Sequence, residues 1–180
     1  MTNFFRRTIS WFIFRIINKP TTAARYLGAK VGEGCKICDD PWKVFGSEPY
    51  LVEIGDNVEI TNGVRFVTHD GSIWVARNED YFKDADVFGK IVVSHNVFIG
   101  INSIILPSSH IEENVIVGAG SIVKGVVESG SVVAGIPAKR IKSVEEYLIG
   151  IEKKIVNTHS LSYENKKRFL LRRDKNGHNT

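Results

Sequence analysis

Hydrophobic residues recur every six positions through the middle of the chain. In successive hexads, the first inward position holds Val93, Ile99, Ile105, Ile111, Val117 and Val123. A second inward position, four residues further on, is small or β-branched and holds Val97, Ser103, Ser109, Val115 and Ser121. This period matches neither an α-helix, with about 3.6 residues per turn, nor a strand that alternates between two faces. It predicts very short strands separated by turns, which is the repeat of a parallel β-helix.

Two segments interrupt the repeat. Hexads begin at Val31, stop over residues 39–50 and then resume. They stop again at residues 68–71 and return at Ile91, after an ejected loop of roughly 20 residues. Three hexads make one triangular coil, so each strand is expected to stack on the strand about 18 residues later, which satisfies the backbone hydrogen bonds of both. Insertions usually build the binding face of a solenoid, so these two loops are expected to form a substrate pocket.

Helical patterns flank the solenoid on its N-terminal side. Phe5, Ile9, Phe12 and Ile16 recur at helical spacing and predict an amphipathic helix, and a short second helix is expected over residues 21–27. Arg15 interrupts the apolar run, no small-residue cleavage site follows it, and the run is too short to span a bilayer. We expect this helix to dock on protein, with peripheral contact to a membrane surface as the alternative.

The C-terminal segment is also predicted to be helical. Near residue 124 the period shortens to a four-residue step and then continues to Arg140. Ser143 and Glu146 form a capping box. Leu148, Ile151, Ile155 and Val156 then give the following helix an apolar face, which we expect to cover the open end of the solenoid. A further short helix is expected over residues 160–173. The predicted organisation is an N-terminal helical segment, 1–30, a solenoid domain, 31–142, and a C-terminal helix with a basic tail, 143–180.

The charge and the cysteine content bear on whether the protein binds nucleic acid or a metal ion. The chain has 180 residues and a net charge of +4, with basic residues concentrated towards both ends, and we predict no nucleic-acid partner. Cys35 and Cys38 form a C-x-x-C without a second pair, whereas a zinc site needs about four ligands. We therefore predict no bound metal and no disulfide, and a reducing cytoplasm as the compartment.

Several motifs resemble the hexapeptide-repeat acyltransferases. They are the T-H-D before the ejected loop, I-G-I-N-S-I-I-L-P at 99–107, V-G-A-G-S-I-V at 117–123 and A-G-I-P-A-K at 134–139. The chain is most similar to the branch of galactoside, maltose and polysaccharide O-acetyltransferases. This resemblance implies an all-β solenoid wound as a left-handed β-helix, an exception to the usual right-handed crossover. It also implies a homotrimer that binds acetyl-CoA between neighbouring subunits.

Histidine suits the chemistry that this resemblance implies. Acyl transfer to a hydroxyl needs a base near its working pH, and free histidine has a pKa of about 6.5. His69 stands where the repeat ends and the ejected loop begins, and it matches the position of the family's catalytic histidine. Glu48 is expected one coil below, where it can orient His69 or accept a hydrogen bond from the acceptor. A solvated acid in a turn is the alternative for Glu48.

The resemblance also assigns residues to the coenzyme. Ile101, Ser103 and Ala119 match positions that line the pantetheine arm. The cations after the last coils are expected to meet the phosphates, and they are Lys124, Lys139, Arg140 and Lys142. Lys124 stands one position earlier than in many relatives, so no phosphate contact is transferred to it directly.

The favoured function is an acetyl-CoA-dependent O-acetyltransferase acting on a sugar in surface polysaccharide synthesis. An N-acetyltransferase of an amino sugar or an antibiotic keeps the same mechanism. A zinc carbonic anhydrase needs three histidines around one metal, with two of them close in sequence, but His69, His95 and His110 are all widely separated along the chain. A non-catalytic scaffold is the remaining class. Trp74, Tyr81 and Phe82 of the ejected loop can stack on a sugar or pack against a neighbouring subunit.

Overall fold

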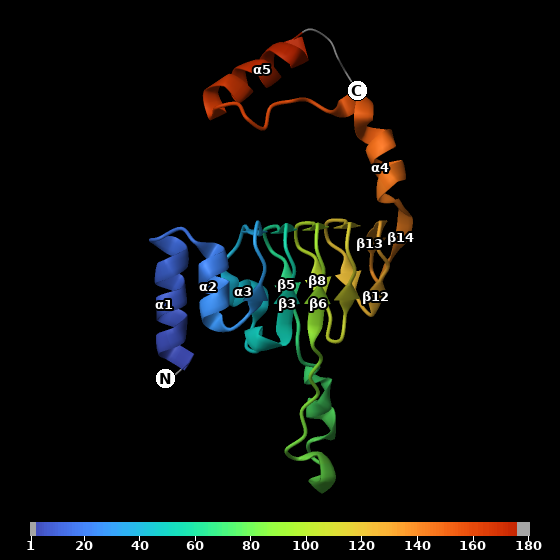
Figure 1. Cartoon of the computed structure of the whole chain (residues 1–180). Helices are drawn as coiled ribbons and strands as arrows, with labels where there is room; N and C mark the ends of the chain where they lie inside the picture. Colours follow the sequence, from blue (N-terminus) through green and yellow to red (C-terminus); the bar gives the residue numbers. More distant parts are fainter. Residues whose placement is uncertain (1–2, 176–180) are drawn as a thin grey trace. The chain divides into compact units, whose positions relative to one another are not determined.

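The computed structural model describes residues 3–175 and divides into two compact units, residues 1–144 and 145–180. The first unit begins with α1 (Asn3–Arg15) and α2 (Pro20–Leu27), continues with the solenoid, and includes the short helix α3 (Pro41–Phe45) (Figure 1). The second contains nearly all of α4 (Val144–Ile151) and the whole of α5 (Tyr163–Lys175). None of the described helices is both long enough and apolar enough to cross a membrane. His178 lies outside the described residues.

Within the described residues, fourteen short strands form three sheets whose pairs are parallel, except for the last strand. The first sheet contains, in spatial order, β1 (Lys30–Val31), β3 (Val52–Ile54), β6 (Ile91–Val93), β9 (His110–Ile111) and β12 (Val126–Val127). The second contains β14 (Ala138–Ser143), β13 (Ser131–Gly135), β10 (Val115–Val117), β7 (Val97–Ile99), β4 (Val58–Ile60) and β2 (Lys36–Ile37). The third contains β11 (Ile122–Val123), β8 (Ile104–Ile105) and β5 (Arg65–Phe66). Each sheet therefore takes one strand from successive coils.

The number of residues between paired positions on stacked strands gives the length of each coil. Val97 pairs with Val115, so an uninterrupted coil has the expected length of three hexads. The coil that joins β1 to β3 is longer, because the α3 segment is inserted there. The coil that joins β4 to β7 is longer still, because it contains the ejected loop. The coil that joins β9 to β12 is shorter than three hexads, because it includes the four-residue step. Insertions and the step thus change the chain length between strands without breaking the stack.

The inward positions predicted from the six-residue period form the core. All six aliphatic residues from Val93 to Val123 are buried, as are the small residues at the second position. Each serine hydroxyl there donates to the carbonyl three residues earlier in its own turn, as Ser103 does to Gly100. Serine therefore fills a narrow corner without leaving a buried polar atom unpaired.

One corner of the coil repeats the same backbone conformation in every turn. Gly34, Asn57, Asn96, Asn114 and Gly130 follow one another up the stack, with φ between 55° and 68°. Asparagine and glycine tolerate this left-handed region better than other residues. The three asparagines also form a ladder, because Asn57 donates its amide to Asn96 at 2.8 Å and Asn96 donates to Asn114 at 2.7 Å.

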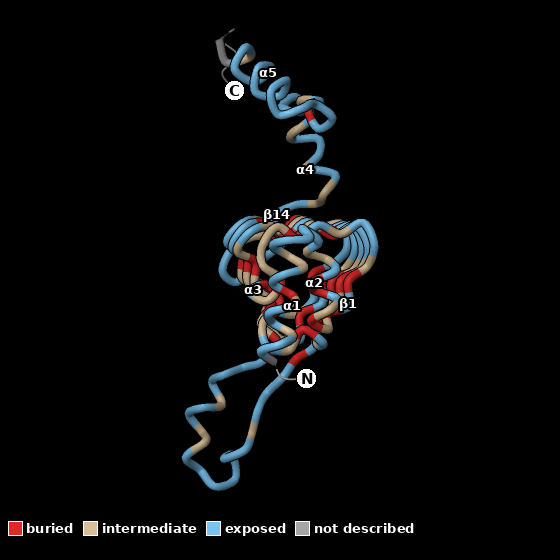
Figure 2. Tube along the Cα trace, turned by 90° about the vertical axis from the view of Figure 1, so that its left-hand side faces the viewer, coloured by how far each residue is buried: buried red, intermediate tan, exposed pale blue. Residues whose placement is uncertain are grey.

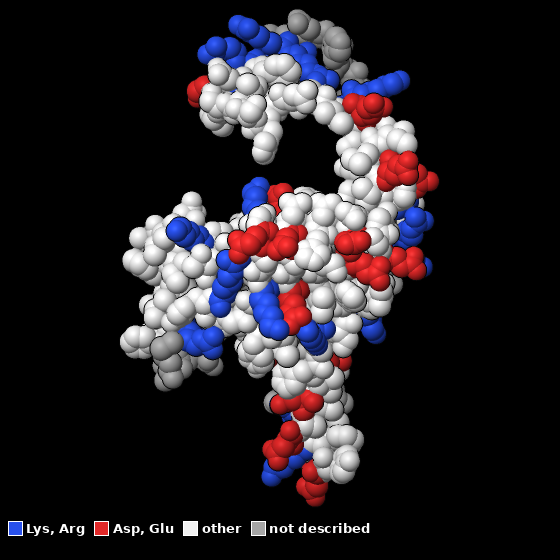
Figure 3. All heavy atoms as spheres, viewed as in Figure 1, with Lys and Arg blue, Asp and Glu red and all other residues white. Residues whose placement is uncertain are grey.

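Helices close the N-terminal end of the stack. Figure 2 shows α1, α2 and α3 in front of the coils, and Leu27 of α2 and Val44 and Phe45 of α3 are buried. The Phe45 ring stacks on Phe66 with 5.4 Å between centroids. α1 packs against α2 and α3, as expected of a helix that docks on protein, but its other side is exposed and shows only basic and uncharged residues in Figure 3.

The C-terminal end differs from the prediction. We expected the helix capped by Ser143 to cover the open coil, but β14 pairs there in antiparallel fashion with β13. α4 does begin at Val144, directly after the predicted cap, but it ends at Ile151 and none of its residues is buried. The physical reason is that an open strand edge presents backbone N–H and C=O groups, which another strand satisfies directly and a helix does not.

Candidate active site

His69 lies at the neck of the ejected loop, just after β5. The two ends of the loop are joined there, because His69 and Phe88 form an antiparallel bridge and their rings meet edge to face. The Asp70 amide donates to the Val87 carbonyl and the Gly89 amide donates to Thr68, each at 2.8 Å. Beyond the neck the loop runs away from the coils through two short 3₁₀ turns, Gly71–Ala76 and Asp80–Phe82 (Figures 1 and 2). The backbone of His69 is thus held even though a long loop follows it.

Glu48 is the hydrogen-bond partner of this histidine. It precedes the 3₁₀ turn Pro49–Leu51, in the insertion that carries α3, and stacking brings it against the end of the next coil. Its Oε2 accepts the Thr68 hydroxyl at 2.8 Å and His69 Nδ1 at 3.0 Å. The Glu48 side chain is only 15% exposed, whereas that of His69 is 48% exposed. The carboxylate is therefore enclosed, and the imidazole extends from it towards solvent.

This contact selects one tautomer of the imidazole. An ionised carboxylate has no proton to donate, so the neutral ring carries its hydrogen on Nδ1 and donates it to Glu48. Nε2 is left unprotonated, with a lone pair available for an incoming proton. The same arrangement stabilises the imidazolium cation that forms when Nε2 takes that proton.

Hydrogen bonds keep the Glu48 carboxyl ionised. Partial burial raises the pKa of its carboxyl, but hydrogen bonds from Ser47, Thr68 and His69, together with the charge of His69, outweigh burial and hold the pKa below its ordinary value. A lowered pKa means that these hydrogen bonds contribute stability at pH values above the ordinary carboxyl pKa of about 4.3. That contribution is lost only as the pH falls through the lowered value.

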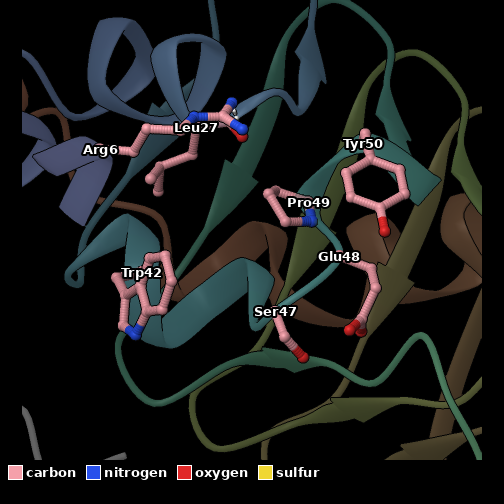
Figure 4. A pocket seen from close by; sticks show the side chains of 7 residues that line it. All are labelled: Arg6, Leu27, Trp42, Ser47, Glu48, Pro49 and Tyr50. Atoms are coloured by element: carbon pink, nitrogen blue, oxygen red, sulfur yellow. Dashed lines mark hydrogen bonds between the residues drawn. The ribbon is translucent and has the colours of Figure 1, made fainter. Parts of the chain in front are cut away.

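A pocket of about 270 Å³ adjoins Glu48. Its lining residues are Arg6, Leu27, Trp42, Ser47, Glu48, Pro49 and Tyr50 (Figure 4). The α3 insertion supplies most of this lining, and its role as a substrate pocket stays a prediction. The ejected loop supplies none of it, because Trp74 and Tyr81 lie beyond the neck and are 72% and 89% exposed. Arg6 reaches the pocket from α1, and no sequence motif indicated it.

The residues assigned to the pantetheine arm fall into two groups. Ile101 and Ala119 are exposed at the same corner of neighbouring coils, and the Gly120 amide donates to the Ile101 carbonyl at 2.8 Å. Gly100 allows this close approach, since a Cβ there would lie 2.5 Å from the Ala119 nitrogen. Ser103 requires a correction: its side chain is fully buried and its hydroxyl is bonded to turn carbonyls, so it faces the core and not a groove.

The basic residues also separate in space. Lys139, Arg140 and Lys142 lie on β14, with Lys139 and Lys142 both exposed. Lys124 belongs to the third face of the coil, and together with Arg140 it lines a hollow at the last coil. Hydrogen bonds from Ser72 lower the pKa of Asp70, and the charge of Lys124 contributes to the same shift. Lys124 is therefore the cation of this set that lies towards the neck.

Within residues 3–175, no group of three or more histidine, cysteine or acidic side chains is arranged to hold a metal ion. Cys35 packs partly against the core, and its thiol donates to the Gly55 carbonyl at 3.0 Å. His95 lies against Asp56, with its Nδ1 accepting the Asp56 amide. The histidine at the neck is thus distinguished from His95 by a carboxylate that is enclosed within the protein.

Comparison with known proteins finds a relative that covers most of the chain and solved structures that superpose on it. Protein CapG from Staphylococcus aureus is 46% identical over 151 residues, which cover 84% of this chain and 87% of CapG. The structure of a maltose O-acetyltransferase from Clostridium difficile 630 superposes with a TM-score of 0.57 at 23% identity, covering 77% of this chain and 84% of that one. A galactoside acetyltransferase in complex with coenzyme A superposes with a TM-score of 0.54 at 21% identity, covering 81% and 82%. No protein-family model matches the chain.

Proposed function

The chain belongs to the hexapeptide-repeat acetyltransferases, and on this premise we propose that it transfers the acetyl group of acetyl-CoA to a hydroxyl group of a sugar. The observation that carries the proposal is the His69–Glu48 pair, which leaves Nε2 free as a base at the neck of the ejected loop. The resemblance of the motifs to polysaccharide O-acetyltransferases supports a role in surface polysaccharide synthesis.

The proposed mechanism is direct transfer between two bound substrates. Acetyl-CoA supplies an activated thioester. His69 Nε2 removes the proton of the acceptor hydroxyl as its oxygen bonds to the acetyl carbonyl carbon, and Glu48 stabilises the resulting imidazolium through Nδ1. The carbon–sulfur bond then breaks, and the same Nε2 returns the proton to the departing sulfur. The products are an acetyl ester and free coenzyme A, and no nucleophilic serine or cysteine is required.

The pocket beside Glu48 supports a sugar as the acceptor. Trp42 and Tyr50, at opposite ends of the pocket in Figure 4, offer aromatic rings on which a sugar can stack, and Ser47 and Glu48 offer hydrogen-bonding groups. The proposal is tested by measuring thiol release from acetyl-CoA with a panel of neutral sugars, amino sugars and aminoglycosides. Release only with amine acceptors would favour the N-acetyltransferase alternative, and release with none of the acceptors would contradict a transferase acting on this class.

We propose that the exposed cations of β14 bind the phosphates of coenzyme A. Replacing Lys139 and Lys142 together with alanine is expected to raise the KM for acetyl-CoA by roughly 2- to 30-fold and to leave kcat unchanged, because exposed ion pairs each contribute up to about 1 kcal/mol. Steady-state kinetics with varied acetyl-CoA measures this. Lys36→Ala, which removes an exposed lysine from the first coil, is the matched control. An unchanged KM in the double variant would show that the phosphates of coenzyme A bind elsewhere on the protein.

We further propose a left-handed winding, a homotrimer and action in the cytoplasm, as the family resemblance implies. Both cysteines are free, which is typical of a reducing compartment. A trimer would supply a second wall for the exposed corner at Ile101 and Ala119. Analytical ultracentrifugation in the presence of acetyl-CoA is expected to give about three times the 20.1 kDa mass of one chain. A stable species at the monomer mass would contradict the intersubunit site.

A further inference from the structure

One side of α1 packs against the rest of the chain, and the other side is exposed and apolar. On the inner side Ser10 is buried, and the Arg6 guanidinium donates to the Leu27 carbonyl at 2.7 Å, which holds α1 against α2. The outer side leaves large apolar residues half or more exposed: Phe4 (77%), Phe5 (60%), Trp11 (50%), Phe12 (50%) and Ile16 (61%). Ile16 directly follows the last residue of α1, and we call these five residues together the outer face of α1. A soluble surface rarely gathers so many aromatic rings on one short helix without a partner.

The surroundings of the outer face are strongly basic. Residues 1–32 contain six of the 24 basic residues and none of the 20 acidic ones, so they carry +6 and the rest of the chain carries −2. Arg25 and Lys30 are paired with Glu33 and Glu53. Among the described residues no carboxylate pairs with Arg7, Arg15 or Lys19, the remaining cations of α1 and its C-terminal end. In the view of Figure 3 the α1 side accordingly shows blue and white spheres without red.

We propose that the outer face of α1 binds the surface of a lipid bilayer that contains anionic lipids. Aromatic and aliphatic side chains of this kind enter the boundary between headgroups and acyl chains, while arginine and lysine remain at the level of the lipid phosphates. A second copy of the chain is a poorer occupant, because a two-fold contact through this face would bring its unpaired cations against one another. The combination of rings and uncompensated positive charge fits an anionic membrane.

The helix that would dock also contributes to the pocket beside Glu48, because Arg6, on its inner side, lines that pocket. The membrane contact does not depend on the proposed reaction, since it concerns lipid and protein alone. Acetyl transfer to a soluble acceptor can therefore be measured on the same variants as a separate check that the protein is folded and that its site is intact.

The test is co-sedimentation of the full chain with vesicles of phosphatidylcholine alone or of phosphatidylcholine with phosphatidylglycerol. The protein is expected to pellet with the anionic vesicles, less so at high salt. Phe5→Gln with Phe12→Gln should abolish most of this binding. Arg15→Gln with Lys19→Gln should weaken it on the order of 30-fold, since each cation near an anionic surface contributes about 1 kcal/mol.

Two control variants make the result specific to α1. Tyr81→Gln removes a ring of the ejected loop that is even more exposed than Phe5 and Phe12, and it should not change vesicle binding. Lys166→Gln with Lys167→Gln removes two cations from α5 and should also leave it unchanged. The proposal is overturned if the unaltered chain stays in the supernatant with anionic vesicles, or if the α5 variant rather than the α1 variants loses binding. It is equally overturned if Phe5→Gln with Phe12→Gln changes the oligomeric state without changing vesicle binding.

Discussion

Replacing His69 with alanine is expected to reduce turnover about 10²- to 10⁴-fold, which is the usual contribution of a positioned general base. The affinity for acetyl-CoA and the thermal stability should change little, because the imidazole is half exposed and its backbone is held by the hydrogen bonds of the neck. The reason for the loss is chemical: without Nε2 no group in this arrangement takes the proton of the acceptor hydroxyl. Steady-state kinetics with an acceptor identified by the thiol-release panel measures the effect.

His95→Ala is the matched control for this variant. His95 is also a solvent-exposed histidine of the solenoid beside an acidic residue, but Asp56, unlike Glu48, is itself exposed. Its loss should leave turnover within about twofold of the unaltered protein, since surface substitutions away from the site have small effects. Near-normal turnover of His69→Ala across the pH range would mean that the neck histidine is structural, and the mechanism would fail.

Removing the carboxylate of Glu48 should produce the second largest effect. Glu48→Ala is expected to lower kcat about 10- to 100-fold, less than the loss of the base itself, because it removes only the orientation of His69 and the charge that stabilises its cation. Glu48→Gln should lose less, since its amide oxygen can still accept from Thr68 and from Nδ1. The KM for acetyl-CoA should stay constant in both variants. Equal losses in Glu48→Gln and Glu48→Ala would show that charge, and not orientation, is the contribution of Glu48.

The pH dependence gives an independent readout of the same pair. Hydrogen bonds hold the pKa of Glu48 below its ordinary value in spite of partial burial, so the carboxylate is ionised throughout the range from about pH 5 to about pH 8. Carbon-13 NMR of the Glu48 side-chain carboxyl should therefore show no titration over that range. A titration of this carboxyl between about pH 5 and about pH 8 would contradict the hydrogen bonding of Glu48 with Thr68 and His69. A merely structural role for Glu48 would change stability in Glu48→Gln without lowering kcat.

Much of the solenoid could be predicted from the sequence because its strands and corners depend on local residue preferences. A short strand needs one or two inward aliphatic side chains, and a corner needs glycine, asparagine or another turn residue. Both requirements repeat every six positions, so Val93 to Val123 predict the strands and the three-hexad offset between stacked partners. The interruptions were also visible, and they correctly placed His69 at a loop neck and Glu48 in the insertion one coil below it.

What the sequence alone could not decide depends on contacts between distant residues. The hydrogen bond from Nδ1 to an enclosed Glu48, the serine at 103 turned into the core, and Arg6 reaching the pocket from α1 each follow from how side chains pack in three dimensions. Six-residue spacing specifies which coil a residue occupies, but it does not specify which atoms meet across coils.

The two ends of the stack also show which features follow from the sequence and which depend on the tertiary structure. The repeat predicted a solenoid with an open C-terminal end, but only the tertiary structure decided that β14 would pair with its last coil. The spacing of Phe5, Phe12 and Ile16 determined a helix, and the fold decided that one side of it would remain free. Periodicity determines secondary structure because it reflects local geometry, whereas the partner of an exposed edge or face is chosen by the free energy of the whole assembled fold.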